Sequence, residues 1–179
     1  MTEAVVQDAL SLPGVTRAEA AYVLPVRAVN GHRNRLTALQ GHFPDADLSR
    51  LVDDAGRFGT PGRDGVIQPE MLVRALGIRV GDDLRLELLA PPRSVLVAPV
   101  TGIIAQGMGQ EVHIAAAALF AAIDSAPQVN MLHLAVQADR MQDLNAAIKQ
   151  TPLVAGLADW AEVRRQFDAT LSENMLTMV

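Results

Sequence analysis

The stretch from Asp64 to Leu89 carries the clearest local folding signals in this chain, and they predict a helix, a tight turn and a strand. Pro69 suits the first position of a helix, where its missing N–H costs nothing, and Gly77 suits the left-handed residue that follows a helix. Glu70–Leu76 is therefore predicted to be helical. We expect four of its side chains to form the buried face: Met71, Leu72, Ala75 and Leu76.

The turn and strand follow directly. Leu84, Leu86 and Leu88 alternate with charged residues, which is the period of a half-buried strand. The two aspartates before them, Asp82 and Asp83, have the chemistry of an acid or a metal ligand. A Gly-Asp-Asp sequence before a strand is more often a turn, because aspartate bonds its own backbone locally. We interpret them as turn residues.

Composition argues against several classes of function. A net charge of −5 and 3% aromatic residues do not suit a nucleic-acid binder, which neutralises phosphates and stacks bases on aromatic rings. The absence of cysteine excludes disulfides and cysteine-ligated metals. The longest uncharged run, Ser94–Gln110, is broken by proline and glycine, whereas a membrane helix needs about 20 apolar residues. No signal peptide is recognisable, so the chain as given is expected to be soluble.

The N-terminal region is predicted to be a helix followed by a hairpin. Residues 2–12 have the apolar spacing of a short amphipathic helix, and residues 15–29 indicate a long strand interrupted at Pro25. Asn30-Gly31 is a strong signal for a two-residue hairpin turn, with the second strand at residues 33–40.

Basic residues surround that turn: Arg27, His32, Arg33 and Arg35. The simplest interpretation is a solvated hairpin tip. The alternative is a contact for anionic lipid headgroups or an acidic partner, made by Arg27, Arg33 and Arg35.

Residues 42–127 are predicted to contain two connectors with a mostly β segment between them. We expect a short helix within residues 44–56 and a Gly/Pro-rich connector at residues 58–65. Residues 95–104 are apolar on both faces and suit a strand in a small barrel or sandwich. Met108, between two glycines, is expected either to make an adaptable apolar partner contact or to be a simple turn or core residue.

The C-terminal region is predicted to be a right-handed strand-helix-strand unit. Its strands are expected at residues 131–137 and 153–158, with a helix from Asp139 between them. A strand at residues 111–114 and a helix at 115–123 precede it, and apolar residues at helical spacing extend from Trp160 to Met178. We therefore predict a discontinuous α+β fold in which residues 1–55 and 128–179 share one α/β domain and residues 56–127 form an inserted, mostly β domain.

No sequence pattern nominates a catalytic, cofactor or metal site. Four histidines, His32, His42, His113 and His133, have no ligand spacing, and no serine lies in a nucleophile elbow. His133 lies between Leu132 and Leu134, so we expect it on the opposite side of its strand, exposed or hydrogen-bonded. The sequence therefore predicts a protein that is not an enzyme.

Several segments together resemble the extracytoplasmic domain of FtsX-like, MacB-type ABC transporter permeases. The matching segments occur in the same order over nearly the whole chain: residues 12–15 (LPGV), a loose glycine-proline pattern at Gly56, Pro61, Gly62 and Gly65, residues 72–88 (LVRALGIRVGDDLRLEL), residues 151–157 (TPLVAGL), and Phe167, Leu171, Glu173, Asn174 and Met175.

The resemblance implies a porter-like α/β domain interrupted by a small, mostly β (sabre-like) domain and carried between transmembrane helices. It implies that the first helix and the helix from Ala161 onward continue into membrane spans. The implied partners are a separate ATP-binding cassette subunit, a second permease protomer or half, and a substrate or extracytoplasmic partner. The implied role is mechanical coupling. A stand-alone extracytoplasmic ligand-binding or adhesion module is the alternative, and it would need a deep, mostly apolar pocket.

Overall fold

The computed structural model describes residues 2–44, 46–49, 51–52, 56, 58–91, 93–105, 111–150 and 158. Within them the elements are α1 (Thr2–Leu10), β1 (Val15–Asn30), β2 (Arg33–His42), β3 (Leu51–Val52), β4 (Phe58–Gly59), β5 (Val66–Pro69), α2 (Glu70–Leu76), β6 (Asp83–Leu88), β7 (Val95–Ile104), β8 (Val112–Ala115), α3 (Ala116–Ala122), β9 (Met131–Val136), a 3₁₀ turn (Ala138–Arg140) and α4 (Met141–Lys149). The fold is α+β.

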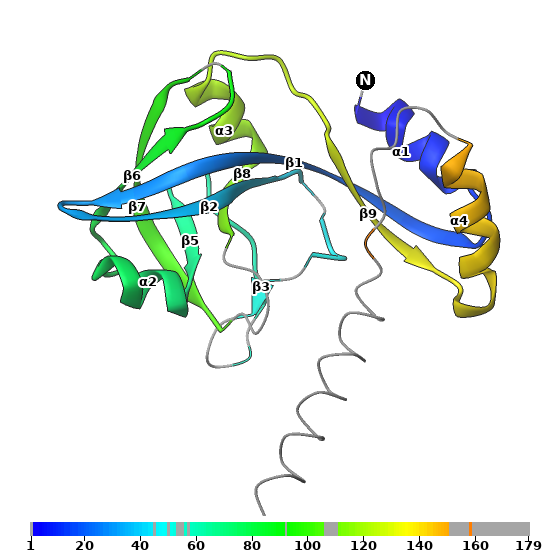
Figure 1. Cartoon of the computed structure of the whole chain (residues 1–179), viewed down its shortest axis with the longest axis horizontal. Coiled ribbons are helices and arrows are strands. Elements are labelled where there is room, and N and C mark those ends of the chain that lie inside the picture. The colour runs from blue at the N-terminus through cyan, green and yellow to red at the C-terminus, as the bar shows by residue number, and fades with distance from the viewer. Residues whose placement is uncertain are drawn as a thin grey trace, which may run out of the picture.

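Most of the strands form one sheet that curls back on itself. Their order is β2-β8-β5-β7-β6-β1-β9, and a further pairing of β1 with β2 closes six of them into a ring. We call this ring the barrel; it comprises β1, β2, β5, β6, β7 and β8. Figure 1 shows β9 lying outside it, beside the start of β1.

The long strand β1 passes through two parts of the molecule. Ala21 pairs with His42 of β2 and also with Met131 of β9, so β2 and β9 occupy opposite edges of β1. Further along, Val26–Val29 pairs with β6 on the edge that β9 has left. The first part of β1 therefore belongs with β9, and its second part belongs to the barrel.

Asn130 fills the place where β1 changes partner. Its side-chain amide accepts a hydrogen bond from the Val23 N–H and donates one to the Val23 carbonyl, both at 2.7 Å. Pro25 follows on the same edge, where its carbonyl accepts the Leu89 N–H at 3.0 Å. Since proline has no N–H, a gap between two partner strands is a position that tolerates it. The predicted interruption at Pro25 is wrong, because the strand continues through it.

An aliphatic core fills the barrel. Val26, Leu39, Val66, Leu84 and Leu86 are fully buried there. Helices α2 and α3 add Leu72, Leu76, Leu119 and Phe120 to the same cluster.

The second part of the molecule contains both α1 and α4. We call it the terminal lobe: α1, the first part of β1 (residues 15–21), β9 and α4. Figure 1 shows the two helices side by side at the end of β1 that is remote from the hairpin. Leu144 of α4 and Ala9 of α1 are buried in it. None of the helices within the described ranges combines the length and apolar character needed to cross a membrane.

The structure confirms the predicted helix, turn and strand with two corrections. α2 has the predicted bounds, and Gly77 is left-handed with φ +64°. Pro69 is the extended residue before the helix, not its first residue, because it still belongs to β5. Met71 is 61% exposed, because the buried face of this two-turn helix is narrow and consists of Leu72 and Leu76. The Asp82 carboxylate accepts the Arg79 N–H at 2.8 Å, as a turn residue does.

Two other local predictions need correction. The predicted two-residue hairpin is confirmed, but its turn is displaced by one residue. Asn30 pairs with Arg33, so the two loop residues are Gly31 and His32, and Gly31 alone supplies the positive φ, +58°. A turn with one left-handed residue at its first central position needs glycine only there. The predicted helix within residues 44–56 is also wrong: Leu51–Val52 is a strand that pairs with Phe58–Gly59.

Several predictions concern residues outside the described ranges. They are the strand at residues 153–158 (of which Ala158 alone is described), the apolar helical pattern from Trp160 onward, and Met108. The division into residues 1–55 with 128–179, and 56–127, stays a prediction. The strand pairing adds that residues 26–29 are bonded to β6 and residues 39–42 to β8, both of which belong to the middle segment.

Candidate functional site

The structure separates the three arginines predicted to form one contact surface. Arg27 faces the outside of the barrel, where it forms an ion pair with Glu87 at 3.4 Å, and Arg85 approaches the same carboxylate at 3.2 Å. Leu36 lies opposite Arg27 on β2, shares that outer face, and is 67% exposed. Arg27, Glu87 and Arg85 therefore form a row of charges on the outer surface of the barrel, which we call the outer charge ladder.

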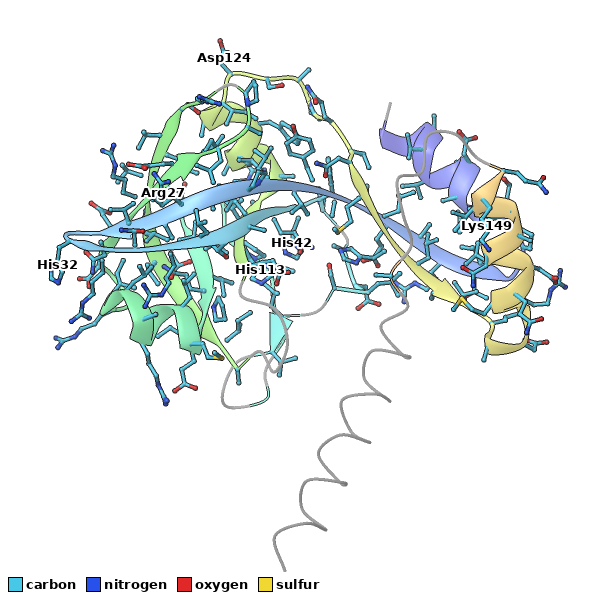
Figure 2. The ribbon with its side chains drawn as sticks, viewed as in Figure 1. Arg27, His32, His42, His113, Asp124 and Lys149 are labelled. Carbon is cyan, nitrogen blue, oxygen red and sulfur yellow. The ribbon has the colours of Figure 1, made fainter. Side chains whose placement is uncertain are left out.

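Arg33 and Arg35 lie on the other face of the hairpin, the face that carries Leu39. The guanidinium of Arg33 occupies the space that a Cβ at Gly77 would fill. Asn30 donates to the Leu76 carbonyl at 3.1 Å beside it. Arg33 thus lies at the C-terminal end of α2, where a positive charge interacts favourably with the exposed carbonyls, so packing supplies one reason for this charge. Figure 2 shows His32 at the tip of the hairpin.

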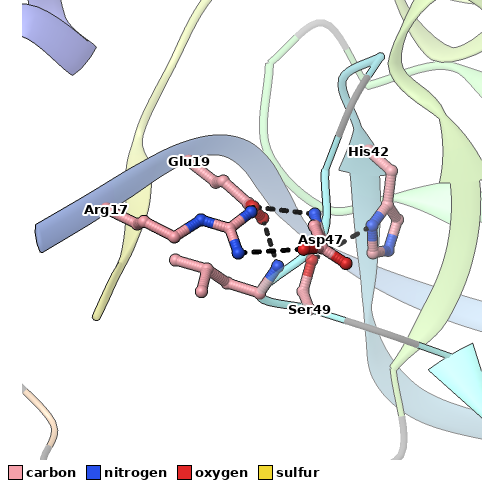
Figure 3. A network of polar contacts seen from close by, with 6 residues as sticks. Arg17, Glu19, His42, Asp47 and Ser49 are labelled. Atoms are coloured by element: carbon pink, nitrogen blue, oxygen red, sulfur yellow. Dashed lines mark hydrogen bonds and ion pairs between the residues drawn. The ribbon is translucent and has the colours of Figure 1, made fainter.

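A polar network that sequence spacing did not nominate lies at the other end of β2, and Figure 3 shows most of it. The Glu19 carboxylate accepts the backbone N–H groups of Asp47 and Leu48, both at 2.7 Å. Arg17 binds the Asp47 carboxylate at 2.9 Å. These contacts attach residues 46–49, which we call the 46–49 loop, to the first part of β1.

Three histidines from three strands come together beside this loop. His42 Nε2 and His113 Nδ1 are 3.0 Å apart, and the Ser49 hydroxyl lies 3.4 Å from His42 Nδ1. Gln40 Nε2 lies 3.1 Å from His133 Nε2, so a barrel residue contacts β9 directly. Figure 2 shows His42 and His113 next to each other. We call Gln40, His42, His113 and His133 the histidine junction.

Burial keeps these histidines neutral. The pKa of His42 is lowered from 6.5 to about 4 by burial and then by His133, against the opposing effect of Glu19. Burial and the neighbouring His42 lower the pKa of His113 to about 3. The pKa of His133 is also lowered, chiefly by burial, against Glu19 and Glu111. The cost of burying a charge exceeds the attraction of the nearby carboxylates.

The alternation of polar and apolar residues along β2 could have predicted a polar face there, whereas a search for ligand motifs does not find the histidine junction. Gln40 and His42 alternate with Leu39 and Gly41, so one face of β2 is polar where the other faces the core. Spacing along the chain is uninformative, because residues 42, 113 and 133 meet through strand pairing. His133 is hydrogen-bonded, one of the two environments expected for it. Among the described residues, no group of three or more potential ligands is arranged to hold a metal ion.

No protein-family model and no curated protein matches the sequence. Solved structures do match. The extracellular domain of the noncanonic ABC-type transporter YknZ from Gram-positive bacteria is 16% identical with a TM-score of 0.55, covering 80% of this chain and 78% of that one. The periplasmic region of MacB from Actinobacillus actinomycetemcomitans is 11% identical with a TM-score of 0.50, covering 86% and 71%.

At these identities the likeness establishes the fold. The chain has the fold of the MacB-like extracytoplasmic domains, as the sequence resemblance predicts. Both neighbours are extracellular or periplasmic parts of larger proteins by their descriptions.

Proposed function

We propose that this chain is the extracytoplasmic domain of an ABC transporter permease and that it couples ATP-driven movement of membrane helices to export of a substrate or to an extracytoplasmic partner. The observation that carries the proposal is the likeness to the YknZ extracellular domain over 80% of the chain. Neither solved neighbour favours the alternative of a stand-alone ligand-binding or adhesion module.

The proposed porter-like and inserted domains correspond best to the terminal lobe and the barrel. We propose this boundary in place of the one predicted near residue 56: it runs through β1 between Ala21, which pairs with β9, and Val26, which pairs with β6. In this proposal the terminal lobe is the part continuous with the membrane spans, and the barrel is held away from the bilayer. ATP hydrolysis takes place on a separate ATP-binding subunit, and a second permease protomer or half completes the transporter.

Coupling of this kind requires that force pass from the terminal lobe to the barrel. β1 is one covalent connection between the parts, because it is hydrogen-bonded to β9 in the terminal lobe and to β6 in the barrel. The direct contact between Gln40 and His133 is a second connection, at 3.1 Å. In this proposal the two parts move relative to each other in each transport cycle, so the Gln40–His133 contact has to open and close while β1 keeps the parts joined.

The proposal is tested by fixing the second connection. Gln40→Cys and His133→Cys introduce two thiols into a chain that has no cysteine of its own. With the complete permease and its ATPase in proteoliposomes, a short bis-maleimide bridge between these thiols is expected to slow transport at least tenfold while ATP hydrolysis continues. Each single variant, treated with the same reagent, controls for modification alone. Transport at the unmodified rate after complete cross-linking would contradict the coupling role.

We also propose that Arg33 and Arg35, not Arg27, form the partner or lipid contact at the hairpin. Arg27 already binds Glu87. Arg33→Glu with Arg35→Glu is expected to weaken sedimentation with phosphatidylglycerol vesicles, or capture of an acidic partner, at least fivefold. Arg27→Gln is the control from the opposite face and is expected to leave binding unchanged. Equal loss in the control would show that overall charge, and not this face, is responsible.

A further inference from the structure

The histidine junction is the place where the barrel, the terminal lobe and the 46–49 loop meet. His42 and His113 belong to paired barrel strands, whereas His133 belongs to β9 of the terminal lobe. The side chains are mostly enclosed: His42 is 7% exposed and His113 is 2% exposed. The His42–His113 contact lies within the barrel. Protonation of His42 reaches the other parts through Ser49 of the 46–49 loop, whose hydroxyl lies 3.4 Å from His42 Nδ1, and through His133 of β9, which opposes a charge on His42.

The contact between His42 and His113 requires that one ring be neutral. At 3.0 Å, one of the two facing nitrogens must carry a proton and the other must accept it. When both rings are protonated, both nitrogens are donors, so the hydrogen bond is replaced by repulsion between two cations. The Gln40–His133 contact is less sensitive, because a side-chain amide can turn over and present its oxygen to a protonated ring.

The charged groups that face the cluster come from every neighbouring segment in the described ranges. β1 contributes Glu19 and Arg17, the 46–49 loop contributes Asp47, and Glu111 lies just before β8. Glu19 and Glu111 favour protonated histidine, but Glu19 already accepts two loop N–H groups and contacts Arg17 at 3.4 Å. These donors partly neutralise the Glu19 charge, so its tendency to raise the histidine pKa values is smaller than the lowering caused by burial.

The direction of the pH effect follows from linkage. A histidine with a pKa of 6.5 when exposed and about 4 at the junction binds more protons in the open form throughout that interval. For each such histidine, the equilibrium constant for opening rises by up to about tenfold per pH unit below 6.5. It stops rising below the pKa that the histidine has in the closed junction. For His42 the equilibrium constant for opening rises about 15-fold between pH 6.5 and pH 5, and His113 adds a comparable factor. The closed junction is fully favoured above pH 6.5.

We propose that the histidine junction is an acid-operated latch: on acidification it opens, so that the terminal lobe and the 46–49 loop move away from the barrel while the barrel core stays folded. The latch depends on the geometry of this chain alone. It would hold even if the domain had no part in a transporter.

The test measures the separation of the two parts as a function of pH. Val97→Cys on the barrel and Asn145→Cys on α4 are exposed positions for spin labels, and the native chain has no cysteine to interfere. Pulsed electron spin resonance is expected to give one narrow distance distribution at pH 7.5. A second, longer population is expected to grow below about pH 6, while far-UV circular dichroism and the amide protection of Leu84 and Leu86 remain unchanged.

Three variants identify the groups responsible. His42→Gln with His113→Gln cannot gain charge and is expected to abolish the longer population down to pH 4.5. If this double variant fails to fold, His133→Gln is tested in its place and is expected to lower the pH midpoint of opening. His32→Gln, at the exposed hairpin tip, is the matched control and is expected to open as the native chain does.

Other outcomes would overturn the latch. One is an unchanged distance distribution between pH 7.5 and pH 4.5. Another is opening that persists in the folded His42→Gln, His113→Gln variant or, where His133→Gln is used instead, an unshifted midpoint. A third is loss of barrel protection with the same pH midpoint as the distance change, because that would be global unfolding and not movement of one part.

Discussion

The barrel and the terminal lobe bury their surfaces in different ways. The barrel core contains large aliphatic side chains from six strands and two helices, and many of them are fully buried. The terminal lobe, in the part that the structure describes, buries mainly alanines, Ala9, Ala20 and Ala21, together with Leu144. Burial of apolar area stabilises by about 25 cal/mol per Å², so alanines contribute little. We infer that the barrel is the stable unit and that the terminal lobe opens more easily.

The largest expected effect compares one buried leucine from each part. Leu86→Ala removes a fully buried side chain from the barrel and is expected to cost about 2–5 kcal/mol of global unfolding free energy. Leu144→Ala, equally buried, is expected to increase amide exchange in β9 and α4 while barrel amides keep their protection. Urea denaturation measures the global free energy of unfolding, and hydrogen exchange measures the protection of individual amides. Equal loss of barrel protection in both variants would mean that the two parts unfold as one.

Asn130 offers a test of the connection between the two parts. Asn130→Ala removes both bonds to Val23 and is expected to cost about 1–3 kcal/mol. Asn130→Asp retains an acceptor for the Val23 N–H but loses the donor to its carbonyl, so an intermediate effect is expected. Exchange of the Val23 amide proton reports the loss directly. If both variants exchange at the native rate, the side chain does not complete this edge of β1.

A substitution inside the barrel is expected to stabilise the folded protein. Gln68 is fully buried, and in the described residues neither its side-chain nitrogen nor its oxygen has a hydrogen-bond partner. Gln68→Met removes the cost of burying an unsatisfied amide and is expected to raise the free energy of unfolding by about 1–2 kcal/mol. Gln40→Met is the matched control and is expected to destabilise, because Gln40 bonds His133. A destabilised Gln68→Met variant would indicate that this amide has a partner in solution.

The smallest expected effect is at the outer charge ladder. Arg27 and Glu87 are separated by 3.4 Å; the Arg27 side chain is exposed and the Glu87 side chain is partly exposed. Exposed ion pairs contribute about 0–1 kcal/mol, so Arg27→Gln is expected to change barrel stability by less than that, and by less still in 1 M salt. A thermal unfolding scan at two salt concentrations suffices. A loss comparable to that of Leu86→Ala would contradict the assignment of stability to the aliphatic core.

Short-range signals in the sequence were sufficient for the helix, turn and strand around Gly77. Leucines at period 2, a left-handed glycine and an aspartate turn each depend on residues only a few positions apart, so local patterns determine them. The same is true of β1, whose length was predicted, although its continuity through Pro25 was not. That continuity depends on Leu89 and Asn130, which lie far away in the sequence.

Tertiary structure decided which strands became partners, and with them the barrel and the histidine junction. An apolar strand such as residues 95–104 suits many partners equally well, and closure of the ring depends on β1 pairing with both β2 and β6. His42, His113 and His133 have no common spacing, and they meet because β2, β8, β1 and β9 pair in register. The sequence by itself determined the alternation of polar and apolar side chains along each strand. Long-range hydrogen bonding determined which of the polar faces would be enclosed, because a buried polar side chain is stable only where another strand brings it a partner.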